Sequence, residues 1–497
     1  MYRESMRAAL SRPAAIVGVL WFCFLAKLIF YSSFIPLWEG YDEFAHFAFV
    51  EYLVDFHALP DLRSAVVPPD VAASLQAGPV PWTIRTWTGS VSYDDYWQGR
   101  HAAPRPAANQ RLYEAQQPPL AYLLYAIPYA AFRHHSLPAR AWLVRITGSL
   151  IVSFVIPLGF FLARRVFGRT TRALGVIAIV ASMPELMMTA DHGGNEPLAI
   201  LLGTACVFAL VSRRALLLGC LLGLGLLTKA YFLTLIPVVV IVFFRQKRKM
   251  LIALVAAVAI AGWWYARALY VTGSLTGTQF SGVTSRSLTA INWPRVADFT
   301  LVSHIWLGGW SFLVVRTWMY RAIEIIMLAA AVGIAVQLVR KRLSEPVAVC
   351  AGTLLSFIAA MAYFAYATWR ATGDAAVFGY YICALVVPEA ICLVAGLATR
   401  YMVPAVVACF ATVELYGTVF LMMPYYAGIT AHTARGSVPA ARLGQIFSAE
   451  LFRHLAVNKP GFLSPGVLIA LWSVFLAALA AIVAVGFVSG FGQRSET

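Results

Sequence analysis

The chain has 497 residues, of which 61% are hydrophobic and 12% are charged, and its mean hydropathy is +0.75. A soluble protein of this length could not bury so much apolar surface, so the composition predicts an all-α polytopic membrane protein. The net charge of +16 comes from basic residues gathered in short loops between apolar runs, which indicates membrane topology and contact with anionic lipid, and no nucleic-acid partner.

Apolar runs long enough for a hydrocarbon core of about 30 Å recur along the chain. No small-residue cleavage site follows the first run, so we interpret it as a retained signal anchor. The cysteines all lie in apolar segments, which predicts no disulfide framework. The pattern predicts about twelve spans, roughly at residues 14–36, 142–163, 173–190, 197–211, 215–228, 231–244, 250–271, 319–339, 346–368, 378–398, 402–424 and 465–488.

One further apolar piece, residues 117–132, begins "QPPLAYLLYAIPYAAF". If it crossed the membrane, the following loop "RRVFGRTTR" would lie outside, against the positive-inside rule. We therefore predict a re-entrant or interfacial helix there, with its bend favoured by prolines. Both termini and the large basic loops are then cytoplasmic, and the protein is a multi-pass inner-membrane protein. Residues 37–141, 272–318 and 425–464 lie outside.

The stretch "WEGYDEFAHFAFVEYLVDF" follows the first span on the outer side, and residues 41–57 contain no glycine or proline. Helical spacing there predicts an interfacial helix, on which Asp42 and His46 share a face while Glu43 points about 100° away. An acidic pair in this place either caps the helix, where its dipole favours negative charge, or carries chemistry.

Other polar residues gather at the outer ends of different spans, and polar groups near a membrane need a reason. Snorkelling or loop solvation would explain each one singly. Together they place carboxylates and cations on one side of the membrane, which suits a negatively charged, membrane-embedded substrate worked on by a carboxylate. The residues are Gln117, Arg145, Asp191, Glu196, Lys229 and Arg267.

In order and spacing, the segments "DE…H", "QPPLAYLLYA", "AWLVRITGSL", "DHGGNEPLA", "GLLTKAYFLTLIP" and "GWWYARALYVTGSLTG" resemble bacterial type C (GT-C) glycosyltransferases. These include the protein O-mannosyltransferases and the lipid A aminoarabinose transferases. The resemblance covers roughly residues 14–280. It divides the chain into a catalytic transmembrane module, 1–280, and a variable transmembrane module, 281–497.

The resemblance implies transfer of a sugar from a polyprenyl-phosphate donor to a glycan, lipid or protein acceptor on the outer face, usually with inversion. Asp42 takes the place of the family's catalytic acid, with Glu43 beside it, and Lys229 and Arg267 would meet the donor phosphate. Asp191 or Glu196 takes the second acidic position, although Asn195 and Leu198 match the family's spacing better.

The remaining site positions match the family's pattern less closely. His46 would hold Asp42 or contact the acceptor, and Gln117 and Arg145 are assigned to substrate binding. Gln117 stands where relatives often have a charged residue, and Tyr380 stands where an arginine is common. No cofactor is certain and no metal ligand is assigned, although a divalent metal stays open.

A carboxylate base fits this chemistry, because taking the acceptor's proton assists attack on the anomeric carbon. Cations near the departing phosphate stabilise its growing charge. Two other classes stay open at this point. A transporter or flippase would favour charges at mid-bilayer and two matching halves. A polysaccharide polymerase or ligase would place its catalytic loop at residues 425–464.

Overall fold

The computed structural model describes residues 2–100, 110–276, 286–397, 401–434 and 436–491. These residues form helices and loops, and the described part of the chain contains no β-strand, only an isolated bridge between Val66 and Arg111. The prediction of an all-α protein is thus confirmed.

Eight helical segments are long and apolar enough to cross a membrane, or up to nine if one bent pair is counted as a span. The fold is that of a multi-pass membrane protein. The segments are α1 (Tyr2–Phe34), α7 with α8 (Leu137–Ser153 and Val155–Phe167), α14 (Lys247–Thr272), α16 (Thr317–Val339), α17 (Glu345–Thr372), η4 with α18 (Gly379–Leu385 and Val386–Leu397), α19 through α20 (Met402–Tyr416 to Met423–Tyr426) and α22 (Pro465–Phe491).

The bent pair consists of α9 (Thr170–Ser182) and α10 (Pro184–Asp191), which meet at 62°. The bend lies at Met183, whose extended backbone interrupts the helix before Pro184. Proline is tolerated at the first position of a new helix but not inside the preceding one.

Four apolar helical pieces are too short to pass the same test: α6 (Leu120–Phe132), α11 (Glu196–Val211), α12 (Ala215–Leu226) and η2 with α13 (Ala230–Leu235 and Ile236–Phe243). With 13 residues, α6 is about 20 Å long, which is less than a hydrocarbon core of about 30 Å. That it does not cross the membrane stays a prediction, because α12, with 12 residues, is shorter still. The other pieces coincide with predicted spans.

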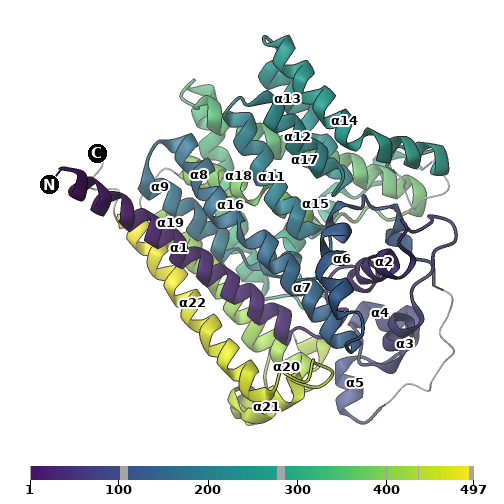
Figure 1. The fold of residues 1–497 in the computed structure, drawn as a ribbon. Coiled ribbons are helices and arrows are strands. Elements are labelled where there is room, and N and C mark those ends of the chain that lie inside the picture. Colours follow the sequence, from purple (N-terminus) through teal and green to yellow (C-terminus); the bar gives the residue numbers. More distant parts are fainter. Residues whose placement is uncertain (1, 101–109, 277–285, 398–400, 435, 492–497) are drawn as a thin grey trace.

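The two ends of the chain meet in the bundle. α1 and α22 run side by side (Figure 1), and α9 packs against both. Their apolar faces form one continuous core with the neighbouring helices. The two modules predicted from the sequence are therefore in direct contact.

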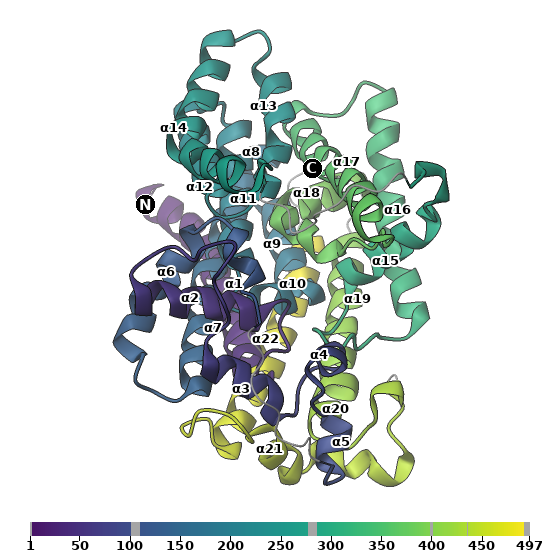
Figure 2. The same cartoon turned by 90° about the vertical axis from the view of Figure 1, so that its right-hand side faces the viewer.

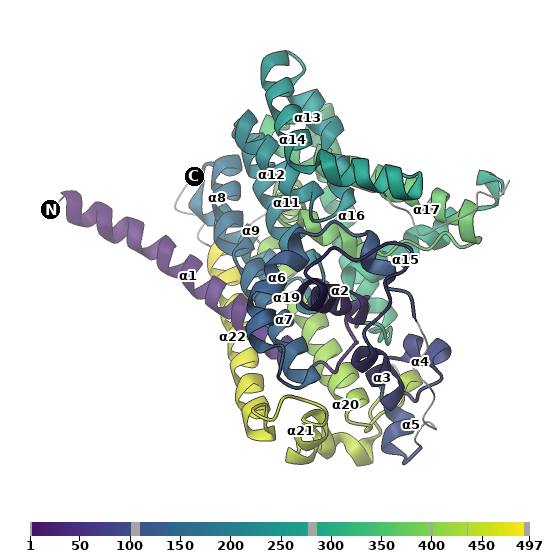
Figure 3. The same ribbon diagram turned by 45° about the vertical axis from the view of Figure 1, so that its right-hand side comes forward.

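The connecting segments gather at one end of the bundle. Figure 2 shows α3 (Pro69–Ala77), α4 (Trp82–Thr88) and α5 (Tyr93–Trp97) near α20 and α21 (Ala449–Leu455). Two pairs of stacked rings join these segments. The ring centroids of Trp82 and His432 lie 4.1 Å apart, and those of Trp97 and His454 lie 4.0 Å apart. α2 (Glu43–Phe56) packs on α6, and α6 packs on α7 (Figure 3).

Candidate functional site

Asp42 is the N-cap of α2, yet its side chain makes no capping hydrogen bond. Its backbone is left-handed, with φ 54°, a conformation that costs free energy in a non-glycine residue. The carboxylate Oδ1 instead accepts a 2.5 Å hydrogen bond from the hydroxyl of Tyr113, in η1 (Tyr113–Gln116). Asp42 is partly exposed while Glu43 beside it is buried. The capping explanation therefore does not apply to the Asp42 side chain.

Glu114 was not singled out from the sequence, and it lies next to this acid. It is buried, and its Oε2 is 3.7 Å from Nδ1 of His46. The same His46 nitrogen is 2.7 Å from the hydroxyl of Tyr122. The motif "EAQQPPL" directed attention to the glutamines before the prolines, whereas the acid two residues earlier is the one that faces α2.

Lys229 begins the short turn after α12 and reaches Glu196 at the start of α11, forming an ion pair with Oε1. The other oxygen, Oε2, is 3.2 Å from Nε2 of His192. The Nδ1 of His192 lies 3.1 Å from the carbonyl of Met188. We call Asp42, His46, Glu114, His192, Glu196 and Lys229 the Asp42 cluster.

Backbone contacts bring these distant segments together. The N–H of Leu120 donates to the carbonyl of Leu227 at 3.0 Å, which joins the "PPL" and "LLTK" motifs. The amide of Asn195 donates to both Gln117 and the carbonyl of Thr228 at 3.3 Å. A side chain at Gly40 would place its Cβ 1.9 Å from the Cβ of His192, so glycine is needed where the chain enters α2.

The electrostatics follow from burial. Burial raises the pKa of Asp42, while the hydrogen bond from Tyr113 and the charge of Lys229 lower it. Burial raises the pKa of Glu114 to about 8, with the charge of Asp42 adding to the shift. Burial lowers the pKa of Lys229 to about 8, although both acids oppose that shift. Burial also lowers the pKa of His46 well below its usual range, so this imidazole is neutral near pH 7.

Glu43 belongs to a second group of charges. Arg145, on α7, donates to both of its carboxylate oxygens, at 2.5 and 2.7 Å. Arg145 also donates to the carbonyls of Ser32, Ile35 and Pro36. These five hydrogen bonds match the five N–H groups of a guanidinium. Arg145 thus has no donor left for the substrate role predicted for it, and Glu43 is held as its counter-ion.

Two further residues complete this group. Asp191, at the end of α10, is buried close enough to Arg145 and Glu43 to interact electrostatically with both. Lys459 comes from the segment 425–464 and donates to the carbonyl of Ile35, which Arg145 also contacts. We call Glu43, Arg145, Asp191 and Lys459 the Arg145 cluster.

Arg267 lies apart from both clusters. Its Nη2 donates to the carbonyl of Pro60 at 3.3 Å, and its guanidinium lies 5.0 Å from the ring centroid of Trp264. The described contacts of Lys229 and Arg267 are with different neighbours, and their meeting at one donor phosphate stays a prediction.

Aromatic rings surround the Asp42 cluster. The Nζ of Lys229 lies 5.6 Å from the ring centroid of Tyr231 and 5.2 Å from that of Tyr381. Tyr380 stacks on Tyr41, next to Asp42, with 4.2 Å between the ring centroids and an interplanar angle of 1°. The position where an arginine was expected is thus a packed tyrosine.

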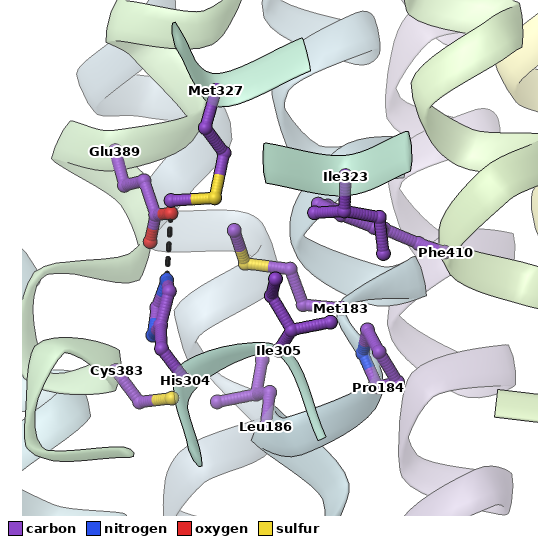
Figure 4. Close-up of a pocket in the computed structure, with 10 residues that line it drawn as sticks. All are labelled: Met183, Pro184, Leu186, His304, Ile305, Ile323, Met327, Cys383, Glu389 and Phe410. Atoms are coloured by element: carbon purple, nitrogen blue, oxygen red, sulfur yellow. Dashed lines mark hydrogen bonds and ion pairs between the residues drawn. The ribbon is translucent and has the colours of Figure 1, made fainter. Parts of the chain in front are cut away.

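A small cavity lies elsewhere, among the membrane helices (Figure 4). Figure 4 shows Glu389 and His304 facing each other across a 2.8 Å contact, with Cys383 below them and methionine and isoleucine side chains around. None of the predicted site residues lines this cavity.

Part of the Asp42 cluster is suited to a metal ion. One ligand atom each from His46, His192 and Glu196 lies within 4.8 Å of the others, and all three residues are buried. No spacing pattern in the sequence predicts this set, because His46 is far from the "DHGGNEP" motif along the chain and is brought there by folding.

No protein-family model matches this sequence, and the search of curated proteins finds no match either. Two crystal structures of ArnT from Cupriavidus metallidurans are similar in fold. The one bound to undecaprenyl phosphate has 13% identity and a TM-score of 0.49 over 97% of this chain and 78% of that chain. The apo structure has 15% identity and a TM-score of 0.43 over 89% of this chain and 74% of that chain. At this identity and TM-score, the likeness carries no function to this chain.

Proposed function

We propose that this protein is a membrane glycosyltransferase that moves a sugar from a polyprenyl-phosphate donor to an acceptor on the outer face, with Asp42 as the base. The observation that carries the proposal is the state of Asp42. Asp42 is a half-buried residue whose carboxylate makes no capping hydrogen bond, accepts a hydrogen bond from Tyr113, and lies among buried charged groups. The polyprenyl donor rests on the motif resemblance.

Each residue has a defined task in this proposal. The carboxylate of Asp42 accepts the proton of the attacking acceptor hydroxyl, which lowers the barrier to attack on the anomeric carbon. The hydrogen bond from Tyr113 holds the carboxylate in one orientation. Lys229, surrounded by the rings of Tyr231 and Tyr381, stabilises the negative charge that develops on the departing phosphate.

The contacts of the two neighbouring acids support different roles for them. Glu43 is fully committed to Arg145, so it cannot take a proton without breaking a buried ion pair. We therefore assign Glu43 a supporting role, that of holding the start of α2, and assign the chemical step to Asp42 alone. Arg267 is left out of the phosphate site, because its contacts lie with Pro60 and Trp264.

The test uses the purified chain in nanodiscs, a panel of polyprenyl-phosphate sugars and a panel of glycan, lipid and peptide acceptors, with acceptor-dependent release of polyprenyl phosphate as the readout. Asp42→Asn should lower the rate about 10²–10⁴-fold, while binding of polyprenyl phosphate, measured separately, stays within a few-fold. Asp55→Asn is the matched control, since Asp55 is an exposed acid on the same helix. Transfer by Asp42→Asn at the normal rate would place the base elsewhere.

A further inference from the structure

The small cavity among the membrane helices is lined by four side chains whose atoms bind soft metal ions. They are His304, Cys383, Met183 and Met327 (Figure 4). They come from four places in the fold, namely α15 (Trp293–Ile305), η4, the bend between α9 and α10, and α16. We infer that these residues bind one monovalent copper ion, Cu⁺. The inference concerns a place outside the Asp42 cluster and does not depend on glycosyl transfer.

His304 has the surroundings of a metal-binding histidine. Its Nε2 lies 2.8 Å from Oε1 of Glu389. Because an ionised carboxylate accepts hydrogen bonds and donates none, Nε2 carries the hydrogen and Nδ1 keeps a free lone pair. Nδ1 is buried and has no hydrogen-bond partner among the residues that the structure describes. A carboxylate behind one imidazole nitrogen fixes the tautomer and orients the other nitrogen toward a metal ion.

Cys383 lies beside this imidazole. Figure 4 shows its sulfur on the side of the His304 ring away from Glu389, and the thiol and the imidazole are close enough to interact. The packing of η4 on α15 sets this approach. The N–H of Gly379 donates to the hydroxyl of Ser303 at 2.7 Å, and a Cβ added at Gly379 would lie 2.7 Å from the Cβ of His304. A close backbone contact therefore holds the two ligand side chains together.

Met183 and Met327 add two thioethers, and Figure 4 shows both side chains directed into the cavity beside His304. Methionine often fills irregular gaps in an apolar core, which would explain the thioethers alone. It does not explain why Nδ1 of His304 and Oε2 of Glu389 are both buried there without a hydrogen-bond partner among the described residues. Such atoms are costly unless a ligand satisfies them, so the cavity is suited to a cation.

Ligand type and charge select the metal. Thiolate and thioether sulfur favour Cu⁺, whereas Mg²⁺ and Ca²⁺ prefer oxygen ligands. Cys383 binds as the thiolate and releases its proton, so one monovalent ion makes the site neutral. Neutrality matters because apolar side chains such as Ile305, Ile323 and Phe410 line the same cavity, where an uncompensated charge is costly. A divalent ion would need a second anionic ligand, which would take Glu389 away from His304.

The test uses the full-length chain in detergent, without an oligohistidine tag, under anaerobic conditions, with Cu⁺ as the probe and bicinchoninate as the competing chelator. The wild type should take up one equivalent of Cu⁺ whose X-ray absorption spectrum shows sulfur neighbours. Cys383→Ser and His304→Ala should lose this equivalent. Glu389→Gln removes only the carboxylate behind the imidazole, so it should weaken binding by about 10–100-fold. Cys206→Ser is the matched control, because Cys206 is a fully buried cysteine of α11 outside the cavity.

Met327→Leu keeps an apolar side chain of similar volume and removes one sulfur ligand. It should weaken Cu⁺ binding while size-exclusion behaviour and helical content are retained, so it tests the inference even if His304→Ala does not fold. Met422→Leu, at a buried methionine outside the cavity, is its control. Copper held by nitrogen and oxygen alone would place the ion elsewhere and overturn the inference. No uptake by the wild type, or equal uptake by the wild type and Cys383→Ser, would overturn it as well.

Discussion

The Asp42 cluster and the Arg145 cluster lie on either side of the same helix start, and they treat charge in opposite ways. In the Arg145 cluster, two carboxylates meet two cations, and the guanidinium of Arg145 uses all of its donors within the protein. In the Asp42 cluster, three carboxyl groups meet a single lysine. A group in which each cation has its own carboxylate stabilises the fold, whereas a group with more carboxyl groups than cations is available to a ligand.

The sharpest way to break this comparison is to remove one cation from each cluster. Arg145→Met leaves Glu43 buried without a counter-ion, which should cost about 3–5 kcal/mol in the free energy of unfolding. Lys229→Met should cost less, because His192 still contacts Glu196 and the carboxyl of Glu114, whose pKa is about 8, can stay protonated. Unfolding in detergent micelles, followed by tryptophan fluorescence, measures both.

Binding of polyprenyl phosphate should be affected in the opposite order to stability. Lys229→Met should weaken binding of polyprenyl phosphate, whereas the folded fraction of Arg145→Met should bind it normally. If Lys229→Met proves the less stable of the two variants, the distinction between a structural and a ligand-binding cluster is wrong.

A buried ion pair among the membrane helices, outside both clusters, extends the comparison. Lys27 on α1 and Glu414 on α19 form a fully buried 2.6 Å ion pair, and Lys27 also donates to the carbonyl of Ala181. Lys27→Met and Glu414→Gln should each destabilise the protein by about 3–5 kcal/mol, because each leaves a buried charged group without its counter-ion. The double variant should lie closer to wild type than the sum of the singles. Additive losses in a double-mutant cycle would show that the two residues are not coupled.

The smallest effect concerns Tyr113. Its hydrogen bond lowers the pKa of Asp42, which burial raises. A base must be deprotonated, so the rate should fall as the pH drops through the pKa of Asp42. Tyr113→Phe removes the hydrogen bond and should move this fall to higher pH, with less than about a tenfold loss at the optimum. The pH profile of transfer measures the shift, and Tyr52→Phe, on the same helix as Asp42, is the control. If the fall in rate at low pH occurs at the same pH in Tyr113→Phe and in the wild type, Tyr113 does not influence the pKa of Asp42.

The sequence predicts the helices better than it predicts their partners. Runs of apolar residues mark the spans because length and hydropathy are local properties, and the outer helix at 41–57 appears as α2. The break at Met183 went unpredicted, although Pro184 marks it, because the apolar pattern continues through the bend. An apolar pattern marks which residues are buried in the membrane region, but it does not show where a helix axis changes direction.

The same limit applies to the site. Asp42, His46, Glu196 and Lys229 were predicted from order and spacing, and the fold places them in one cluster. The pairing of Glu43 with Arg145 joins residues 102 positions apart and depends on how α2 meets α7. Glu114 was missed for a similar reason, since only the contact with His46 reveals it.

The separation between Lys27 and Glu414 has a consequence for biosynthesis. The two residues are 387 positions apart, so the first span enters the bilayer long before its counter-ion is synthesised. A lysine near the middle of an isolated span costs about 2.5–3.5 kcal/mol on insertion scales. The nascent first span therefore depends on the surrounding apolar residues, and later on the carbonyl of Ala181, to stay inserted. The counter-ion of Lys27 is added when α19 is synthesised, and the bundle closes when α22 then packs along α1.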